Sequence, residues 1–301
     1  MAEGDILIFD RRALRRHRER AARQRRAEFL LEEASERLAQ RLEDVTHRFP
    51  RALALGARGG ILARALAGRG GIESLVEMEE GPGLLPAGAR GALIAEAEAL
   101  PFAPGSFDLV VSALTLHWTN DLPGALLQLR HALRPDGMLL AALFGGETLT
   151  ELRAAFLEAE LELEGGASPR VAPMADARDL AGLLQRAGFA LPVVDSDRLT
   201  VTYGNAFALM ADLRAMGETN ALRERRRGFT RRQTLLRMAE LYRERHAGAD
   251  GRIPASFEIV TLTAWAPHAS QPKPLRPGSA TTRLADALGT QEKSAGEKTG
   301  R

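Results

Sequence analysis

The feature that most constrains the fold of this 301-residue chain is a regular alternation, beginning after Pro50, of short apolar runs with segments of helix-forming residues. Such an alternation is typical of βαβ units, whose strands pair in parallel and whose helices cover the sheet. The runs lie at 52–55, 72–77, 91–95, 107–112 and 138–144. The fourth, FDLVVS, suits a central strand that is buried on both faces. The pattern predicts an α/β protein with one doubly wound, mostly parallel sheet.

Further elements are expected around this sheet. A helix is predicted to begin at Asp121, whose side chain suits an N-cap, and another to span 176–187. Strands at 199–203 and 257–264 are expected at the far edge of the sheet. Between them, the helical stretches 206–216 and 231–245 form an insertion, about 204–252, that is placed to cover a site as a lid.

The sequence pattern also predicts three parts of the chain. Residues 1–48 form an N-terminal helical extension, in which helix formers from about Arg12 to Val45 and a stripe of apolar residues from Leu31 to Val45 predict helical structure with a docking face. Residues 49–266 form the main domain. Residues 267–301 form a C-terminal extension, and 289–301 is predicted to be a disordered tail because small and polar residues accumulate there.

Composition excludes several kinds of chemistry. The chain has no cysteine, which excludes disulfides, thiolate nucleophiles and cysteine-bound metal centres. No stretch approaches the about 18 apolar residues that a membrane span needs, so we expect no membrane span and a cytoplasmic location. The net charge of +2 gives no indication of a nucleic-acid partner. The arginine-rich segment 11–26 is interrupted by acidic residues and favours a solvated helix face, which an acidic protein surface could contact.

A glycine-rich segment follows the first apolar run. Gly56 and Gly60 lie between that run and the next helical segment, where glycines let backbone N–H groups face a nucleotide-like ligand. Glu77 ends the second predicted strand and Glu96 ends the third. Acidic side chains at the carboxyl ends of parallel strands are typical of a ribose-binding site, although helix capping would explain each of them singly.

The segment 95–137 contains the short motifs LPF, SFD, LHW and LRPDG. They resemble the LPF-x-x-x-SFD-x-V, L-H-W and LRP-G-G blocks of class I S-adenosylmethionine-dependent methyltransferases, with Asp136 in the first glycine place. Within that superfamily, HWTNDLPGAL, ALFGGETLTELR, EGGASPRVAP, MADLRAMGETN and PLRPGSAT are similar to the mitochondrial complex I assembly factor 5 family and its bacterial relatives. Malonyl-acyl carrier protein methyltransferases are more distantly similar. Together the blocks cover most of the chain from Asp10 to about Leu288.

This resemblance implies a Rossmann-like methyltransferase fold and S-adenosylmethionine as the cofactor. It implies that Gly56 and Gly60 lie along the methionine part of the cofactor and that Glu77 holds the ribose. Glu96 and Ala97 would frame the adenine.

The glycine loop departs from the family's pattern at two positions. Ala54 stands where an acidic residue helps to organise the amino-acid end of the cofactor, and Arg58 stands where the middle glycine is usual. Arg58 either reaches the cofactor's carboxylate or points away at the surface. The departures leave three outcomes for cofactor binding: weakened, altered or lost.

Three further residues are candidates for catalysis. His117 and Trp118 follow the fourth predicted strand, where a histidine could act as a base and an indole could form a pocket wall. Glu147 follows the fifth, and either lies beside the substrate or begins a helix. Glu218 and Asn220 belong to a family-like block in the insertion, but we expect a cap or a turn there.

Three functions remain open. The first is an S-adenosylmethionine-dependent methyltransferase-like enzyme acting on a protein substrate, with a complex I subunit as the candidate. The second is a protein arginine hydroxylase of the assembly-factor type, for which the sequence shows no recognisable 2-His-1-carboxylate metal site. The third is a non-catalytic assembly protein with a degenerate cofactor loop. A nicotinamide dehydrogenase is disfavoured because G-x-G-x-x-G is absent from the loop.

Overall fold

The computed structural model describes residues 7–24, 27–56, 58–86, 88, 91–272, 282 and 284–291. The chain divides into two units, 1–267 and 268–301, and each is described by itself. The described part of the second unit contains one short helix, α9 (Leu284–Leu288). Most of the predicted disordered tail, 289–301, lies outside the described residues.

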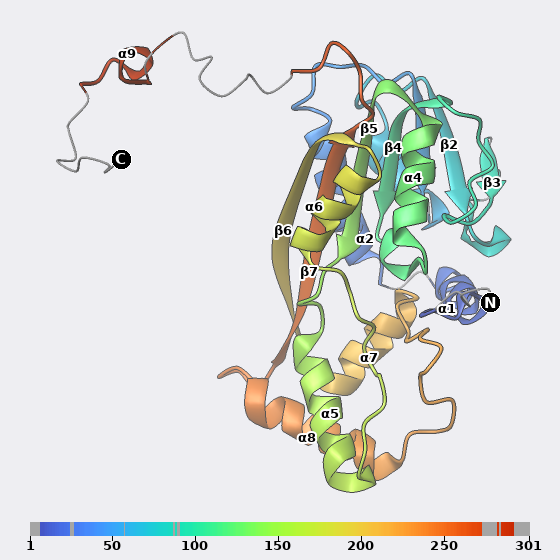
Figure 1. The fold of residues 1–301 in the computed structure, drawn as a ribbon. Coiled ribbons are helices and arrows are strands. Elements are labelled where there is room, and N and C mark those ends of the chain that lie inside the picture. The colour runs from blue at the N-terminus through green and yellow to red at the C-terminus, as the bar shows by residue number, and fades with distance from the viewer. Residues whose placement is uncertain are drawn as a thin grey trace, which may run out of the picture. The chain divides into compact units, whose positions relative to one another are not determined.

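The first unit is built on a seven-stranded sheet with the order β3-β2-β1-β4-β5-β7-β6 (Figure 1). The first five strands pair in parallel, and the last two add antiparallel pairs at one edge. The chain reverses its direction of progress across the sheet between β1 and β4, which is the switch point where doubly wound folds bind ligands. The predicted fold class is therefore confirmed. The strands are β1 (Arg51–Leu55), β2 (Ser74–Glu79), β3 (Ala92–Ile94), β4 (Phe107–Ala113), β5 (Leu133–Phe144), β6 (Ala190–Tyr203) and β7 (Ile253–Trp265).

Helices cover both faces of the sheet. On one face, α2 (Phe29–Arg41) and α3 (Ile61–Leu66) pack against alternate residues of β1, β4 and β5. On the other face, α4 (Leu122–Ala132) and α6 (Ala177–Arg186) pack against the intervening residues. The predicted cap is confirmed, because the Asp121 carboxylate accepts a hydrogen bond from the N–H of Gly124.

The predicted N-terminal helical extension contains two helices in its described residues. The first, α1 (Arg11–Ala22), packs with Phe9, Trp118 and Leu222 in a small core of its own. The second, α2, buries its apolar stripe on the sheet. Helix propensity is high throughout both segments, but one straight helix cannot pack on two separate surfaces, so tertiary contacts decide where the first helix ends.

A helical lobe lies below the sheet in Figure 1 and is reached by the long strands β6 and β7. It contains α5 (Thr150–Glu164), α7 (Ala206–Ala215) and α8 (Arg232–His246), with α5 packed against α8. Residues 204–252 leave the sheet after Tyr203 and return at Ile253, its register partner. Among the described residues, no helix is both long and apolar enough to cross a bilayer.

Several strands extend beyond their predicted bounds, among them β5, β6 and β7. β6 begins at Ala190, well before the expected start at Leu199. The polar and mostly exposed residues 195–198 interrupt its apolar pattern, which an edge strand paired on one side permits. β2 ends at Glu79 and not at Glu77. The carboxylate at the end of the strand is therefore that of Glu79.

Candidate active site

The glycine-rich segment after β1 is a tight turn beside the end of β4. Gly56 has φ +83°, and a Cβ there would overlap Thr115 Oγ1, so only glycine fits. Gly59 and Gly60 also have positive φ, and α3 begins directly after them. The turn brings its backbone to the switch point of the sheet.

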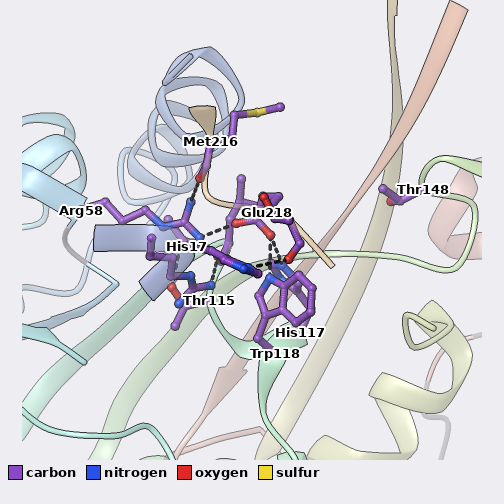
Figure 2. A network of polar contacts seen from close by, with 12 residues as sticks. His17, Arg58, Thr115, His117, Trp118, Thr148, Met216 and Glu218 are labelled. Carbon is purple, nitrogen blue, oxygen red and sulfur yellow. Dashed lines mark hydrogen bonds and ion pairs between the residues drawn. The ribbon is translucent and has the colours of Figure 1, made fainter. Parts of the chain in front are cut away.

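Arg58, in the middle of this turn, points inward. Its backbone N–H donates to Glu79 Oε1 at 2.7 Å. Its guanidinium donates to the carbonyl oxygens of Leu114 at 2.9 Å and Met216 at 3.2 Å, and its Nη2 lies 2.6 Å from Glu218 Oε1. Figure 2 shows this side chain reaching from the turn toward Met216 and Glu218. The backbone of Arg58 is itself left-handed, at φ 38°, which is a strained conformation for a residue other than glycine.

Glu218 lies at the centre of the polar network. Its second oxygen accepts from Trp118 Nε1 at 2.6 Å and lies 3.3 Å from His117 Nε2 (Figure 2). Burial alone would raise the pKa of Glu218, but the charge of Arg58 and the hydrogen bond to His117 outweigh burial and hold it far below its usual range. Glu218 is therefore an ionised, buried carboxylate. The expectation of a cap or turn role for it is wrong.

His117 and Trp118 lie on the short 3-10 helix η3 (Leu116–Trp118) that follows β4. Burial lowers the pKa of His117, and the nearby Glu218 offsets this only in part. The imidazole is therefore neutral, and its Nε2–H donates to Glu218. The ring of Trp118 meets that of Phe9 edge to face, with 5.1 Å between centroids, which fixes the indole against the N-terminal segment.

A cavity of about 750 Å³ opens on the far side of this network, between the sheet edge and the helical lobe. Trp118 and Glu218 form part of its wall, and Glu218 is the one carboxylate among its described lining residues. The side chain of His117 is 1% exposed and lies behind Glu218. The apolar part of the wall includes Phe144, Leu152, Phe156, Met210 and Phe257.

The remaining predicted residues lie at different depths. Glu77 is buried in β2, and its Oε2 has no hydrogen-bond partner. Burial raises its pKa, opposed by the charge of Arg64. Ala97 is buried, whereas Glu96 is exposed two residues beyond β3.

Glu147 is exposed, and its backbone N–H donates to Glu258 Oε2 at 2.8 Å. It is not among the described residues that line the cavity. The structure thus brings Arg58, His117 and Trp118 together around Glu218, and leaves Glu147 outside this group. Within the described residues, no group of three or more histidine and acidic side chains is placed to hold a metal ion.

Comparison with known proteins identifies the family. Residues 53–141 match the methyltransferase domain family, in the region that contains the glycine turn and β4. The human mitochondrial arginine-hydroxylase NDUFAF5 is 40% identical over 287 residues, which cover 93% of this chain and 83% of that protein. This chain belongs to the NDUFAF5 family. The malonyl-[acyl-carrier protein] O-methyltransferase of Halorhodospira halophila is 36% identical over 274 residues, covering 88% and 91% of the two chains.

Solved structures agree with membership of the class I methyltransferase superfamily. A methyltransferase of Bacillus halodurans superposes with a TM-score of 0.53 at 14% identity, covering 78% of this chain and all of the other. The YcgJ protein of Bacillus subtilis gives 0.53 at 13% identity, with 77% and 98% covered. At these identities the likeness concerns the fold alone.

The NDUFAF5 comparison also corrects one expectation. We expected a cytoplasmic location, but the human, mouse and zebrafish NDUFAF5 proteins to which this chain is similar are all named as mitochondrial. The cytoplasmic expectation rested on the absence of an apolar leader or span, and this absence does not distinguish between the two compartments. The methyltransferase-domain match supports S-adenosylmethionine as the cofactor of this fold.

Proposed function

We propose that this chain is an S-adenosylmethionine-dependent enzyme that modifies a side chain of a protein partner during the assembly of respiratory complex I. The observation that carries the proposal is the cavity of about 750 Å³ with the ionised Glu218 and the Trp118 indole in its wall. Its position at the carboxyl edge of the sheet is where folds of this type carry out chemistry. The volume suits a side chain with part of its backbone.

The cavity favours a substrate group that can donate hydrogen bonds. Four arginines line the cavity: Arg170, Arg225 and Arg226 are each paired with a carboxylate outside its wall, and Arg214 lies beside them. Glu218 is the one carboxylate among the described lining residues, and its oxygens also accept from Arg58, Trp118 and His117. A guanidinium is the side chain that such an acceptor binds best, which agrees with the arginine-hydroxylase name of the relatives.

We assign positioning roles to two of the predicted catalytic residues. Neutral His117 donates its Nε2–H to Glu218, and Trp118 donates its indole N–H to the same oxygen. Together they hold the carboxylate toward the cavity, and Trp118 also forms a wall for the substrate. Glu147 is exposed in the turn before α5, a position that does not support substrate contact.

The backbone and side-chain groups beside the turn fit the cofactor. Glycine backbone at Gly56 and Gly60 can approach it closely, and the unpartnered Oε2 of buried Glu77 is an acceptor suited to a ribose hydroxyl. Glu96 and Ala97, beyond β3, are the candidates for the adenine end. When bound, S-adenosylmethionine would supply an electrophilic methyl group, whose transfer depends chiefly on alignment of donor and acceptor.

The inward position of Arg58 favours a second candidate, a non-catalytic assembly protein. Arg58 fills space beside the turn that a cofactor would approach, and the void left there measures about 50 Å³, far below the about 300–1,000 Å³ of typical ligand pockets. Cofactor entry therefore requires the Arg58 side chain to move. A protein in which it never moves would keep the fold and bind partners only.

Calorimetric titration with S-adenosylmethionine and S-adenosylhomocysteine tests the cofactor directly. We expect micromolar binding, about −8 kcal/mol, that Glu77→Ala weakens about tenfold. Glu73→Ala, which removes an exposed carboxylate near the start of the same strand, is the matched control and should leave the affinity unchanged. Absence of heat with both ligands would favour the non-catalytic candidate.

Mass spectrometry of complex I subunits incubated with the protein and cofactor tests the reaction. Methyl transfer adds one CH₂ group to the modified side chain, whereas the alternative arginine hydroxylation adds one oxygen atom. Glu218→Gln is expected to abolish either modification, while Glu224→Gln, an exposed carboxylate of the lid segment, should not. Equal modification by both variants would remove Glu218 from the active site.

A further inference from the structure

Arg18 is a buried cation whose charge is poorly matched by its neighbours. Its side chain comes from the inner face of α1 and is 2% exposed. Its hydrogen bond, from Nη2 to the Leu114 carbonyl oxygen, is long at 3.4 Å, and its Nε has no partner. Among the described residues no carboxylate lies within ion-pair distance of the guanidinium. An uncompensated buried charge costs several kcal/mol, so such a group points to a missing anion.

The acidic residues nearest to Arg18 are engaged elsewhere. Glu218 pairs with Arg58, and Glu80 pairs with Arg11. Glu79 accepts the backbone N–H of Arg58, and burial raises its pKa, which disfavours its charged form. Arg58, itself a cation, lies close enough to repel Arg18. Among the described residues Arg18 is therefore left without a carboxylate partner of its own, in contrast to Arg11 and Arg58.

A void of suitable size adjoins this cation. It measures about 50 Å³ and is lined by Arg18 of α1, by Arg58 and Gly59 of the glycine turn, by Glu28 and by mostly apolar residues. This exceeds the about 10–15 Å³ that holds one water molecule and is far too small for a nucleoside. A carboxylate group fits a space of this size.

We propose that Arg18 binds the carboxylate at the amino-acid end of the cofactor. This inference rests on the proposed use of S-adenosylmethionine, and it names the residue that fixes the cofactor's charged end. Arg18 and Arg58 converge on the same carbonyl oxygen of Leu114, beside the turn along which the methionine part is expected to lie. The N-terminal helix α1 thereby completes the cofactor site. The planar guanidinium can hold a carboxylate through two parallel hydrogen bonds.

The test compares two ligands that differ at the carboxylate end. S-adenosylhomocysteine carries the amino acid, and 5′-methylthioadenosine has the same nucleoside without it. Wild-type protein should bind the former more tightly by about tenfold to a hundredfold, the range for a hydrogen bond to a charged group. Arg18→Met should remove most of that preference and leave methylthioadenosine affinity unchanged. Arg18→Lys keeps the charge but not the two parallel N–H donors, so its preference for S-adenosylhomocysteine should lie between those of wild type and Arg18→Met. Arg16→Met, at an exposed arginine of the same helix, is the control.

Each outcome either supports or overturns the proposed carboxylate site at Arg18. Equal wild-type affinities for the two ligands, or an Arg18→Met effect of equal size on both, would overturn the carboxylate site while leaving the cofactor proposal intact. Binding of neither nucleoside would overturn the proposed cofactor instead. In that case free methionine is the probe: a rise in unfolding temperature for wild type but not Arg18→Met supports a carboxylate site, and no rise overturns it. Circular dichroism of each variant establishes that it is folded.

Discussion

Arg58 shows how one side chain can occupy the space beside a glycine-rich turn. The backbone still follows the turn, with φ 38° at Arg58. The guanidinium donates hydrogen bonds to three acceptors, one directly after β4 and two in the lid. A left-handed backbone costs a non-glycine residue about 1–3 kcal/mol, which the buried contacts offset. The residue therefore joins the turn to the lid through Glu218.

Removing this side chain is expected to open the turn. Arg58→Gly combined with Glu218→Gln removes the pair without leaving a buried charge unpaired, and glycine suits the positive φ. We expect S-adenosylhomocysteine to bind about tenfold more tightly, about 1.4 kcal/mol, measured by calorimetry. The reference is Glu218→Gln alone, which keeps Arg58. An affinity no higher than that of the reference would show that Arg58 does not obstruct the cofactor.

The buried, neutral His117 is expected to make stability depend on pH. In the unfolded chain a histidine protonates near pH 6.5, whereas burial lowers the pKa of His117 in the folded state. Below pH 6.5 the unfolded state thus binds the proton more readily, and the free energy of unfolding falls as the pH falls, by at most about 1.4 kcal/mol per pH unit.

His117→Gln keeps a donor near the Nε2 position but cannot titrate. Between pH 7 and about pH 5 its free energy of unfolding, measured by urea denaturation, should fall less steeply than that of wild type. His17 also has a pKa lowered by burial and remains in both proteins, so the difference between the two slopes isolates His117. Identical slopes would show that His117 titrates normally.

The sequence singled out Glu218 only as part of a family-like block and did not indicate its central role, although it indicated its partners. His117 and Trp118 stood out because they follow a predicted strand, and Arg58 because it replaces a glycine. Glu218 lies 100 residues from Trp118 and 160 from Arg58, in a segment without periodic pattern. Only the packing of the lid against the sheet edge brings these groups together.

At the scale of elements, the sequence predicted helices and strands correctly where their formation depends on neighbouring residues. The cap at Asp121 and the five apolar runs gave helix α4 and the parallel strands, because capping and burial depend on neighbouring residues. It failed at the start of β6, where the polar residues 195–198 interrupt the apolar pattern, and it did not locate the break between α1 and α2, which tertiary contacts decide.

The docking of α1 is expected to contribute strongly to stability. Leu14 is fully buried between α1 and the lid segment, so Leu14→Ala should lower the free energy of unfolding by about 3 kcal/mol. Leu127→Ala, at an exposed position of α4, should change it by less than about 1 kcal/mol. Chemical denaturation of the two variants checks this. A small effect at Leu14 would mean that α1 is only loosely attached.

At the scale of the whole first unit, the lid, the N-terminal segment and the sheet are expected to unfold together. Asp10 is hydrogen-bonded to Ala221 and paired with Arg225, so the N-terminal segment and the lid hold each other in place. The chain's tryptophans report on different regions: Trp118 lies beside the lid, and Trp265 ends β7.

Single-tryptophan variants make the prediction measurable. In Trp265→Phe the fluorescence of the remaining Trp118 reports on the junction with the lid. In Trp118→Phe the fluorescence of Trp265 reports on the sheet. In each variant the fluorescence transition in denaturant should coincide with that of circular dichroism, as for a two-state unit. An earlier fluorescence transition in Trp265→Phe alone would show that the lid opens before the sheet unfolds.

The pairing of Tyr203 with Ile253 has a consequence for how such proteins diversify. Residues 204–252 leave and re-enter the sheet at adjacent points of one antiparallel ribbon. A segment whose ends are held side by side can be exchanged for another of different length without altering the register of any strand. Relatives that share this sheet are thus free to evolve new acceptor preferences by replacing one module, while inheriting the cofactor edge unchanged.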